Sequence, residues 1–245
     1  MLDITSIKIA CSECSLNRLC LPMGLEEQEI SRLDAVLKRP RPLKRGENLF
    51  QAGDAFHSLY VVRAGTVKTF TPCEDGSEQV IGFHLPGELV GLDAIEQERH
   101  MCSAKVLESS SVCELPFERL QELTLEIPSL QKHFFRLLSQ ELAKDETMLL
   151  LLGKATAEER LATFLLNVAK RFRARGYSDK EFNLSMSRHD IGNYLGLAVE
   201  TISRMFSRFQ DEGVISVHRK NIVIKDLDRL AAMAHRSARC ASDGK

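Results

Sequence analysis

Two short amphipathic helices joined by a tight turn constrain this chain more than any other feature of its sequence. Ser187 and Asp190 form a capping box that begins the first helix, and Gly196 is the turn residue that ends it. The second helix is expected from about residue 198 to 210, with apolar and polar side chains on opposite faces. The apolar face comprises Ile202, Met205, Phe206 and Phe209, and the polar face Glu200, Ser203, Arg204, Ser207 and Arg208. The pattern predicts a helix-turn-helix that docks by one face and presents the other.

The presented face carries the side chains that DNA base edges require. Arg204 can donate two hydrogen bonds to guanine, Glu200 can accept one from cytosine, and Ser203 can do either. These residues lie in the first half of the second helix, the part from which recognition helices read bases. The expected DNA contacts are Val199, Glu200, Ser203 and Arg204 near the bases, and Arg188, His189 and Arg208 on phosphates.

A basic hairpin and a local excess of positive charge accompany the two helices. Gly213 precedes two β-type runs, 214–217 and 222–224, around a basic turn at 218–220, which predicts a two-stranded wing. Residues 154–225 hold thirteen Lys and Arg against eight Asp and Glu, a net +5 in a chain of net charge −1. A helical hairpin within a core is the alternative, but the polar face, the wing and the charge together favour binding of a phosphate backbone.

Residues 43–116 have the pattern of short strands rather than helices. Glycines separate five β-type runs, which predicts an antiparallel barrel or jelly roll. A short helix is expected before them, over residues 25–37, and Pro40 and Pro42 end it. The five runs are 59–62, 66–70, 79–84, 103–107 and 111–115.

After Pro128 a helical pattern continues to about Leu152, before Gly153. Six of its residues follow alternating spacings of three and four, the a/d pattern of a coiled coil. The stripe is short, so a homodimer interface is favoured, and packing on the chain's own barrel stays open. Asp145 in this stripe would face its own copy in a two-fold dimer and weaken association, unless it is rotated to the rim. The stripe is Phe135, Leu138, Leu142, Asp145, Leu149 and Leu152.

These patterns predict an α+β chain with a β jelly roll, a long dimerisation helix and a C-terminal winged helix-turn-helix. A capping box at Thr156 and Glu159 begins the last domain, whose first helix should stop at Gly176. No window approaches the roughly 20 apolar residues that cross a bilayer, and no basic segment precedes an apolar run, so a cytoplasmic protein without a membrane partner is expected. The expected domains are a cysteine-rich segment 1–24, the sensor domain 25–127, the dimerisation helix 128–153 and the DNA-binding domain 154–245.

Four of the seven cysteines have a spacing typical of metal ligands. Cys11, Cys14 and Cys20 form C-x2-C-x5-C, and Cys113 ends a predicted strand far along the chain. Four thiolates suit zinc or an iron-sulfur cluster, and the spacing leaves both open, as well as free thiols. Structural zinc sites usually use two close pairs, so three clustered ligands and a distant one favour iron-sulfur. The other cysteines lack a partner at ligand spacing and are expected to be ordinary thiols: Cys73, Cys102 and Cys240.

The stretch from Ser187 to Ile215 resembles the winged helix of the cyclic-AMP receptor protein family, specifically its fumarate-nitrate reductase regulator (FNR) branch. The matching motifs are Asp190-Ile191-Gly192 and Val199-Glu200-Thr201-Ile202-Ser203-Arg204, and the likeness extends over nearly the whole chain. In that branch the residues matching Glu200, Ser203 and Arg204 contact bases of a TTGAT half-site. The resemblance therefore implies a two-fold symmetric TTGAT/ATCAA operator on double-stranded DNA.

The same resemblance bears on the cysteines and on Asp145. Cys11, Cys14, Cys20 and Cys113 coincide with the ligand pattern of FNR-type regulators. There a [4Fe-4S] cluster supports DNA binding without oxygen, and oxygen degrades it. The aspartate matching Asp145 is associated in that branch with keeping the cluster-free form monomeric. The loop from Glu74 to Ser77 resembles a surface that contacts RNA polymerase, although a plain turn explains it equally well locally.

The barrel segment 46–65 resembles a cyclic-nucleotide-binding domain, but the residues that would bind the nucleotide are missing. Binders in this family place a glutamate after the glycine matching Gly91 and an arginine before the serine matching Ser103. This chain has Leu92 and Cys102 there. A cyclic phosphate would be buried without a charged partner, so no cyclic nucleotide is expected as the effector.

These observations predict an oxygen-responsive transcription regulator that binds DNA as a homodimer and contacts RNA polymerase. A zinc-stabilised or thiol-switch regulator of the same fold is the alternative. An iron-sulfur electron carrier is a third class, but it would have no use for the helix-turn-helix and wing. The histidines are scattered, and the sequence contains neither a nucleophile motif nor a glycine-rich phosphate loop, so an enzyme is not expected.

Overall fold

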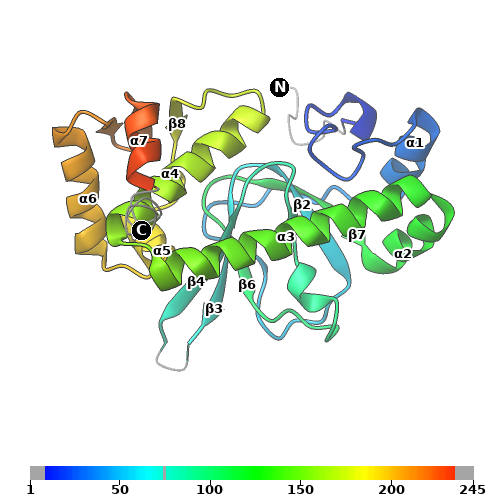
Figure 1. Cartoon of the computed structure of the whole chain (residues 1–245). Helices are drawn as coiled ribbons and strands as arrows, with labels where there is room; N and C mark the ends of the chain where they lie inside the picture. The colour runs from blue at the N-terminus through cyan, green and yellow to red at the C-terminus, as the bar shows by residue number, and fades with distance from the viewer. Residues whose placement is uncertain (1–8, 74–75, 235–245) are drawn as a thin grey trace, which may run out of the picture. The chain divides into compact units, whose positions relative to one another are not determined.

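The computed structural model describes residues 9–73 and 76–234 (Figure 1). The chain divides into two compact units, Met1–Glu141 and Leu142–Lys245, and each is described by itself below. The boundary falls inside the long helix α3 (Pro128–Lys154), so the domain limits expected at residues 24, 127 and 153 stay predictions. None of the helices in the described ranges combines the length and apolar character that crossing a membrane requires. Cys240, Glu74 and Asp75 lie outside the described residues.

The first unit is built on two antiparallel sheets. One has four strands in the order β1-β6-β3-β4, and the other has three in the order β5-β2-β7. The five predicted β-type runs all form strands. Two further strands were missed because two or three residues are too few for an alternating pattern to be recognised. The strands are β1 (Asn48–Phe50), β2 (Ser58–Ala64), β3 (Val67–Pro72), β4 (Glu78–His84), β5 (Leu89–Val90), β6 (Ser103–Val106) and β7 (Ser111–Pro116).

The larger buried cluster of this unit joins strands, helices and the cysteine-rich segment. Helix α1 (Glu27–Val36) confirms the expected short helix, and α2 (Phe117–Glu126) is a helix that sequence analysis did not predict. Each large apolar side chain that is fully buried contributes about 1.5–3 kcal/mol to folding. Among the members of the cluster are Leu21, Leu33, Leu59, Leu115, Leu120, Ile127 and Leu130. A second, smaller cluster includes Phe50, Val62, Val67 and Cys102.

Helix α3 is longer than expected, because it passes through Gly153 and ends at Lys154. Its first turns pack on the larger cluster through Leu130, Phe134 and Leu137. The predicted coiled-coil stripe lies on other faces: Phe135 is 61% exposed, Leu142 66% and Leu149 71%. Asp145 is also exposed, and Leu138 and Leu152 are half-buried. The stripe is therefore not the face that docks on the barrel.

After the C-terminal part of α3, the second unit continues with α4 (Ala157–Ala174), and its last described helix is α7 (Leu227–Ala234). Both predicted capping boxes form, at Thr156 with Glu159 and at Ser187 with Asp190. The wing has three strands in the order β8-β10-β9, one more than expected, because the short β8 was missed. The remaining elements are β8 (Glu181–Asn183), α5 (Arg188–Leu195), α6 (Val199–Asp211), β9 (Ile215–His218) and β10 (Asn221–Ile224).

Two glycines and one arginine fix the turn between α5 and α6. Gly196 has a φ of 64°, which favours glycine. A Cβ on Gly192 would lie 2.7 Å from the carbonyl oxygen of Leu197, so only glycine allows the chain to come this close. The guanidinium of Arg160 donates to carbonyls at the ends of two helices, Leu152 O at 2.7 Å and Leu195 O at 3.0 Å. It thereby ties the last turn of α3 to the last turn of α5.

The capping box at the start of α4 gives a prediction for stability. Thr156 Oγ1 accepts from the backbone N–H of Glu159 at 3.3 Å, and Glu159 Oε2 accepts from that of Thr156 at 2.7 Å. We expect Thr156→Ala to lower the free energy of unfolding of the second unit by about 1–2 kcal/mol, measured by urea denaturation. Thr147→Ala is the matched control, because the Thr147 hydroxyl only donates to the Ala143 carbonyl within α3. Equal midpoints for the two variants would show that the cap contributes nothing.

Candidate functional site

The three N-terminal cysteines lie in a succession of tight turns. Cys11–Glu13 is a single 3-10 turn, and the backbone then turns again at Cys14–Asn17 and at Leu16–Cys20. Such turns place several side chains on one side within a short length of chain. The fourth cysteine, Cys113, comes from β7, where it pairs with Val61 of β2.

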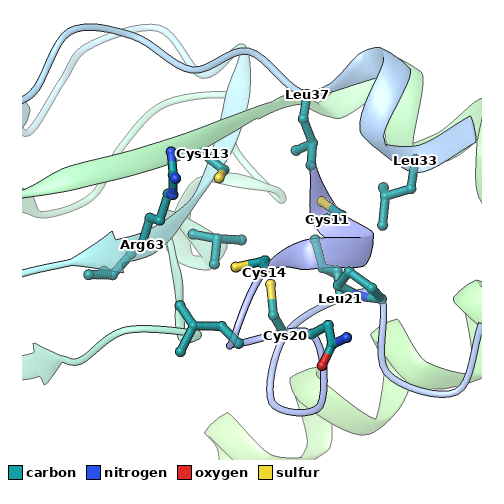
Figure 2. Close-up of a pocket in the computed structure, with 13 residues that line it drawn as sticks. Cys11, Cys14, Cys20, Leu21, Leu33, Leu37, Arg63 and Cys113 are labelled. Carbon is teal, nitrogen blue, oxygen red and sulfur yellow. The ribbon is translucent and has the colours of Figure 1, made fainter. Parts of the chain in front are cut away.

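All four predicted ligands line one pocket (Figure 2). The space measures about 410 Å³, part of it open to solvent. Its wall is mostly apolar, supplied by Leu21, Leu33, Leu37 and Val61 among others. The two remaining described cysteines lie elsewhere: Cys73 is exposed, and Cys102 is buried in the smaller apolar cluster. The structure thus brings together cysteines nearly a hundred residues apart and leaves the others out.

Burial dominates the electrostatics of these thiols. It raises the pKa of Cys11 and of Cys113, and it raises the pKa of Cys20 to about 12. The other thiols of the pocket raise each of these pKa values further, so the four side chains are within electrostatic reach of one another. Cys11, Cys20 and Cys113 are therefore protonated in the metal-free protein at neutral pH. A bound metal would have to displace those protons, because the thiolate is the ligand.

Two residues of the α1 region hold the first cysteine turn. The backbone N–H of Cys11 donates to Asp34 Oδ1 at 2.8 Å, and Arg39 forms an ion pair with the same carboxylate. Burial alone would raise the pKa of Asp34, but the hydrogen bonds from Cys11 and Arg39 outweigh it and keep that pKa below its usual range. The guanidinium of Arg39 also lies 3.9 Å from Cys11 Sγ.

Arg39 and Arg63 bring positive charge to the pocket. Arg63 lines it from β2, and the coulombic effect of both guanidinium groups opposes the burial that raises the pKa of Cys113. Four thiolates around a metal group would leave excess negative charge in an apolar wall, and these cations would offset part of it. Sequence analysis missed Asp34 and Arg39, because charges beside a short helix more often mark a solvated face.

The donor set fits a cluster better than a single ion. Within residues 9–73 and 76–234, no three His, Cys, Asp or Glu side chains converge closely enough to hold one metal ion. Tetrahedral zinc would require sulfur atoms about 3.8 Å apart, given a zinc-sulfur bond of about 2.3 Å. An iron-sulfur cluster accepts its thiolates on different iron atoms and so takes more widely spread ligands. The four cysteines line one pocket, and no three of them converge on a single point, which fits the second requirement better.

The second candidate surface is the polar face of α6. Ile202, Phe206 and Phe209 are buried and dock the helix, as predicted, whereas Met205 is only half-buried. The expected base contacts Glu200, Ser203 and Arg204 are exposed, as are His189 and Arg208, and Val199 and Arg188 are half-buried. Within the described part of the second unit, no other element covers this face, so it can enter a DNA groove.

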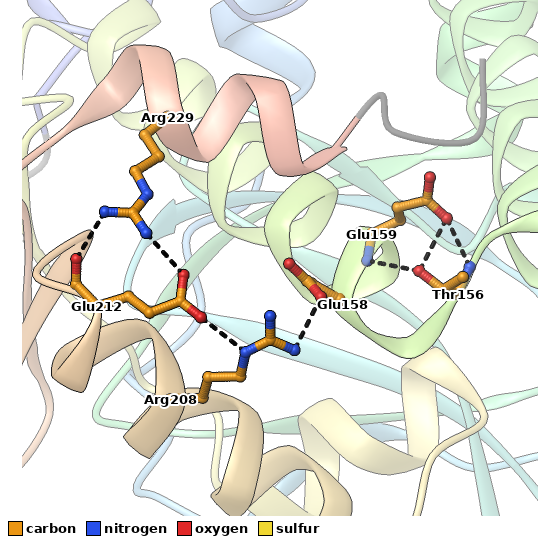
Figure 3. A network of polar contacts seen from close by, with 6 residues as sticks. All are labelled: Thr156, Glu158, Glu159, Arg208, Glu212 and Arg229. Carbon is orange, nitrogen blue, oxygen red and sulfur yellow. Dashed lines mark hydrogen bonds and ion pairs between the residues drawn. The ribbon is translucent and has the colours of Figure 1, made fainter. Parts of the chain in front are cut away.

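The two arginines expected on phosphates have a further role that sequence analysis missed. Arg188 stacks on Phe206, with its Cζ atom 3.1 Å from the ring centroid, and burial lowers its pKa to about 10. Arg208 pairs with Glu158 of α4 at 3.0 Å and with Glu212 at 2.7 Å (Figure 3). Arg229 of α7 pairs with the same Glu212 at 2.9 Å. Both arginines therefore hold α6 against its neighbours, and phosphate contact stays a prediction for them.

The segment around Cys102 and Ser103, where the resemblance would place a cyclic phosphate, is hydrogen-bonded within the chain. Asp93 Oδ2 accepts from the backbone N–H groups of Met101 at 2.9 Å and Cys102 at 3.1 Å. The hydroxyl of Ser103 accepts from the backbone N–H of Ala52 at 3.0 Å. An entering anion would have to displace a carboxylate from these donors.

Comparison with known proteins supports this architecture. Residues 40–126 match the cyclic nucleotide-binding domain family, and residues 159–233 match the Crp-like helix-turn-helix domain family. The solved structure of FixK2 from Bradyrhizobium japonicum superposes with a TM-score of 0.74 at 30% identity, over 81% of this chain and 97% of that one. The expected fold class is confirmed.

Two curated relatives align with nearly the whole chain. The transcriptional activator protein Anr of Pseudomonas protegens is 54% identical over 224 residues, which cover 91% of this chain and 92% of Anr. The fumarate and nitrate reduction regulatory protein of Escherichia coli is 50% identical over 226 residues, covering 92% and 90% of the two chains. Both are named as regulators and neither as an enzyme.

The contact between Asp34 and the first cysteine turn gives a prediction that requires no metal. We expect Asp34→Ala to accelerate alkylation of Cys11 in the metal-free protein by about tenfold, because a lost hydrogen bond to a charged group is worth about 1.5 kcal/mol of local stability. Mass spectrometry of alkylated peptides would measure the rate at each cysteine.

Glu27→Ala on the same helix is the control, since Glu27 is exposed at its first turn. Exposed Cys73 serves as the internal reference for reagent activity. An unchanged Cys11 rate in Asp34→Ala would mean that something other than this carboxylate protects the turn.

Proposed function

The chain belongs to the FNR-type branch of the cyclic-AMP receptor protein (Crp) family of transcription regulators, and on that premise we propose that it is an oxygen-responsive regulator binding TTGAT/ATCAA-type operators as a homodimer. The observation that carries the proposal is the meeting of Cys11, Cys14, Cys20 and Cys113 in one pocket of a chain with a Crp-like helix-turn-helix. The chain is a regulator rather than an enzyme.

The four cysteines would hold a [4Fe-4S] cluster. Such a cluster supplies sensitivity to oxygen, since oxidation breaks it down. The chain contributes the thiolates, the apolar wall that limits access of water, and the positive charge of Arg39 and Arg63. A zinc-stabilised regulator is disfavoured because no three of the four thiols converge on one point, and a thiol switch leaves unexplained why four cysteines line one pocket. An electron carrier would not use the exposed face of α6.

The DNA-binding part of the proposal rests on the exposed polar face of α6. Arg204 and Glu200 would read bases of the TTGAT half-site together with Ser203, and His189 would contact the backbone. Two copies related by a two-fold axis would read the two halves of the operator. The loop between β3 and β4 would contact RNA polymerase in the cytoplasm, where such a regulator works.

Dimerisation would use the exposed apolar stripe of α3. Exposed side chains as large as Phe135, Leu142 and Leu149 at a/d spacing favour burial against a second copy. Asp145 in the same stripe makes the association marginal, so a small change in α3 shifts the population strongly. Loss of the cluster would then lower DNA binding by lowering the fraction of dimer. Cyclic nucleotides would have no part in this control, because the chain has Leu92 and Cys102 where binders of this family carry a glutamate and an arginine.

Purification without oxygen tests the proposal directly. We expect a brown protein with iron and sulfide in equal amounts, which shifts a TTGAT/ATCAA operator in a gel and loses both the colour and the shift in air. Salt dependence of the shift would show that phosphates are contacted. A colourless anaerobic protein with zinc, or a brown protein that ignores the operator, would contradict the proposal.

Cysteine variants make this experiment specific. Cys113→Ala should abolish both the colour and the anaerobic shift, whereas Cys102→Ala should keep both. The pair is matched, since both side chains lie in the barrel but only Cys113 lines the pocket.

The dimerisation helix gives a separate prediction. Asp145→Ala should raise dimer association at least tenfold and allow operator binding in air without the cluster, because it relieves roughly 1–4 kcal/mol of like-charge repulsion. Sedimentation and operator shifts in air would measure this. Glu146→Ala, which removes the neighbouring exposed charge outside the stripe, should stay monomeric. If the Asp145 variant is monomeric and inactive in air, the α3 argument is wrong.

A further inference from the structure

Helix α3 and the cysteine turns are joined by a buried hydrogen bond near the start of the helix. His133 of α3 places its Nε2 atom 3.2 Å from the carbonyl oxygen of Cys20. We propose that His133 is a positioning residue that couples the turn at Cys20 to the orientation of the dimerisation helix. The inference rests on the function proposed above and adds the residue that carries the signal.

The chemistry of the contact fixes a proton on one ring nitrogen. A carbonyl oxygen only accepts, so Nε2 of His133 must carry the hydrogen and donate. The other ring nitrogen, Nδ1, is buried and has no hydrogen-bond partner in the described part of the chain. The ring is only 5% exposed. His133 therefore donates a hydrogen bond to the backbone of a cysteine, at a site with little access to water.

Cys20 is suited to pass on a change at its sulfur. Its side chain lines the pocket, while its carbonyl oxygen accepts from both His133 and the backbone N–H of Met23, the latter at 3.0 Å. Its neighbour Leu21 is 1% exposed in the larger apolar cluster. A displacement of the thiolate on loading or loss of the metal group would therefore move the carbonyl that His133 binds.

The hydrogen bond between His133 and Cys20 fixes the rotation of α3 about its axis more closely than the surrounding apolar contacts do. Leu130, Phe134 and Leu137 hold α3 on the barrel by apolar packing, which tolerates small rotations and slides. A hydrogen bond is directional and weakens steeply when its geometry is lost. Phe135 lies two residues after His133, about 200° around the helix axis. A rotation that satisfies or breaks the His133 bond therefore turns the dimer stripe by the same angle.

Three substitutions separate this role from a merely structural one. His133→Leu removes the donor, His133→Gln keeps a donor at a similar reach, and His133→Asn keeps the donor but shortens its reach. In anaerobically purified full chains, we expect all three to load the same iron and sulfide as the wild type. We expect dimer association and operator affinity to fall at least tenfold in His133→Leu and His133→Asn. In His133→Gln, both should stay within threefold of the wild type. Lys132→Ala, an exposed neighbour, is the control.

Hydrogen exchange on the metal-free chains gives a second readout that does not depend on the cluster. Exchange at Met23 and at the start of α3 should be faster at both places in His133→Leu and His133→Asn. In His133→Gln, it should keep the wild-type rate. If His133→Leu folds poorly, the comparison of His133→Gln with His133→Asn decides whether the hydrogen bond couples the two segments. Equal dimerisation of His133→Asn and His133→Gln would overturn the proposal. Loss of the cluster in His133→Leu and His133→Asn, with normal exchange in α3, would also overturn it.

The two proposals fail differently. A wild-type chain that takes up no cluster rejects the oxygen-responsive function. The exchange measurements then still decide whether His133 couples the two segments. The coupling alone is rejected if the wild-type chain takes up the cluster and dimerises, and the three His133 variants dimerise equally well.

Discussion

The apolar cluster that contains Leu21, Leu33 and Leu130 is the interaction on which the first unit depends. The cysteine segment consists of turns, which lack the cooperative hydrogen bonding of a helix or sheet and cannot hold a shape alone. Burial of Leu21 fixes these turns against α1 and the start of α3. The same burial that forms the pocket therefore also connects it to the helix proposed to dimerise. In the proposed mechanism, sensing and assembly share this core, so a change in it would affect both.

Much of the architecture could be predicted, because several of its determinants are local. The capping boxes at Thr156 and Ser187 each depend on residues within four positions, the turn at Gly196 begins with a local glycine, and all three form as expected. The long strands were also found from their pattern. β1, β5 and β8 are too short to show one, and α2 begins after Pro116 without a capping side chain. Gly153 favours a helix end, but α3 continues to Lys154, where the carbonyl of Leu152 accepts from Arg160 in a contact that spacing cannot reveal.

The sites were predictable to the extent that residue type and spacing determine them. Cys11, Cys14 and Cys20 are close in sequence, and the resemblance to a family identified Cys113 as their partner. Asp34, Arg39 and His133 could not be found this way, because each acts through a neighbour brought close only by the fold. The same holds for the α6 face. Its exposed side follows from helical periodicity, whereas the ion pairs of Arg208 depend on α4 and α7, which periodicity within α6 does not place.

Asp93 has a consequence for anyone who wishes to redesign this barrel as a receptor for a small molecule. Its carboxylate already accepts from the backbone N–H groups of Met101 and Cys102, in the segment where the resemblance places a cyclic phosphate. An arginine introduced at position 102 would meet that carboxylate first and form an internal ion pair. The engineered residue would then lock the loop rather than open it to a nucleotide. Ligand responsiveness would have to begin with the removal of a charge, and only afterwards with the addition of one.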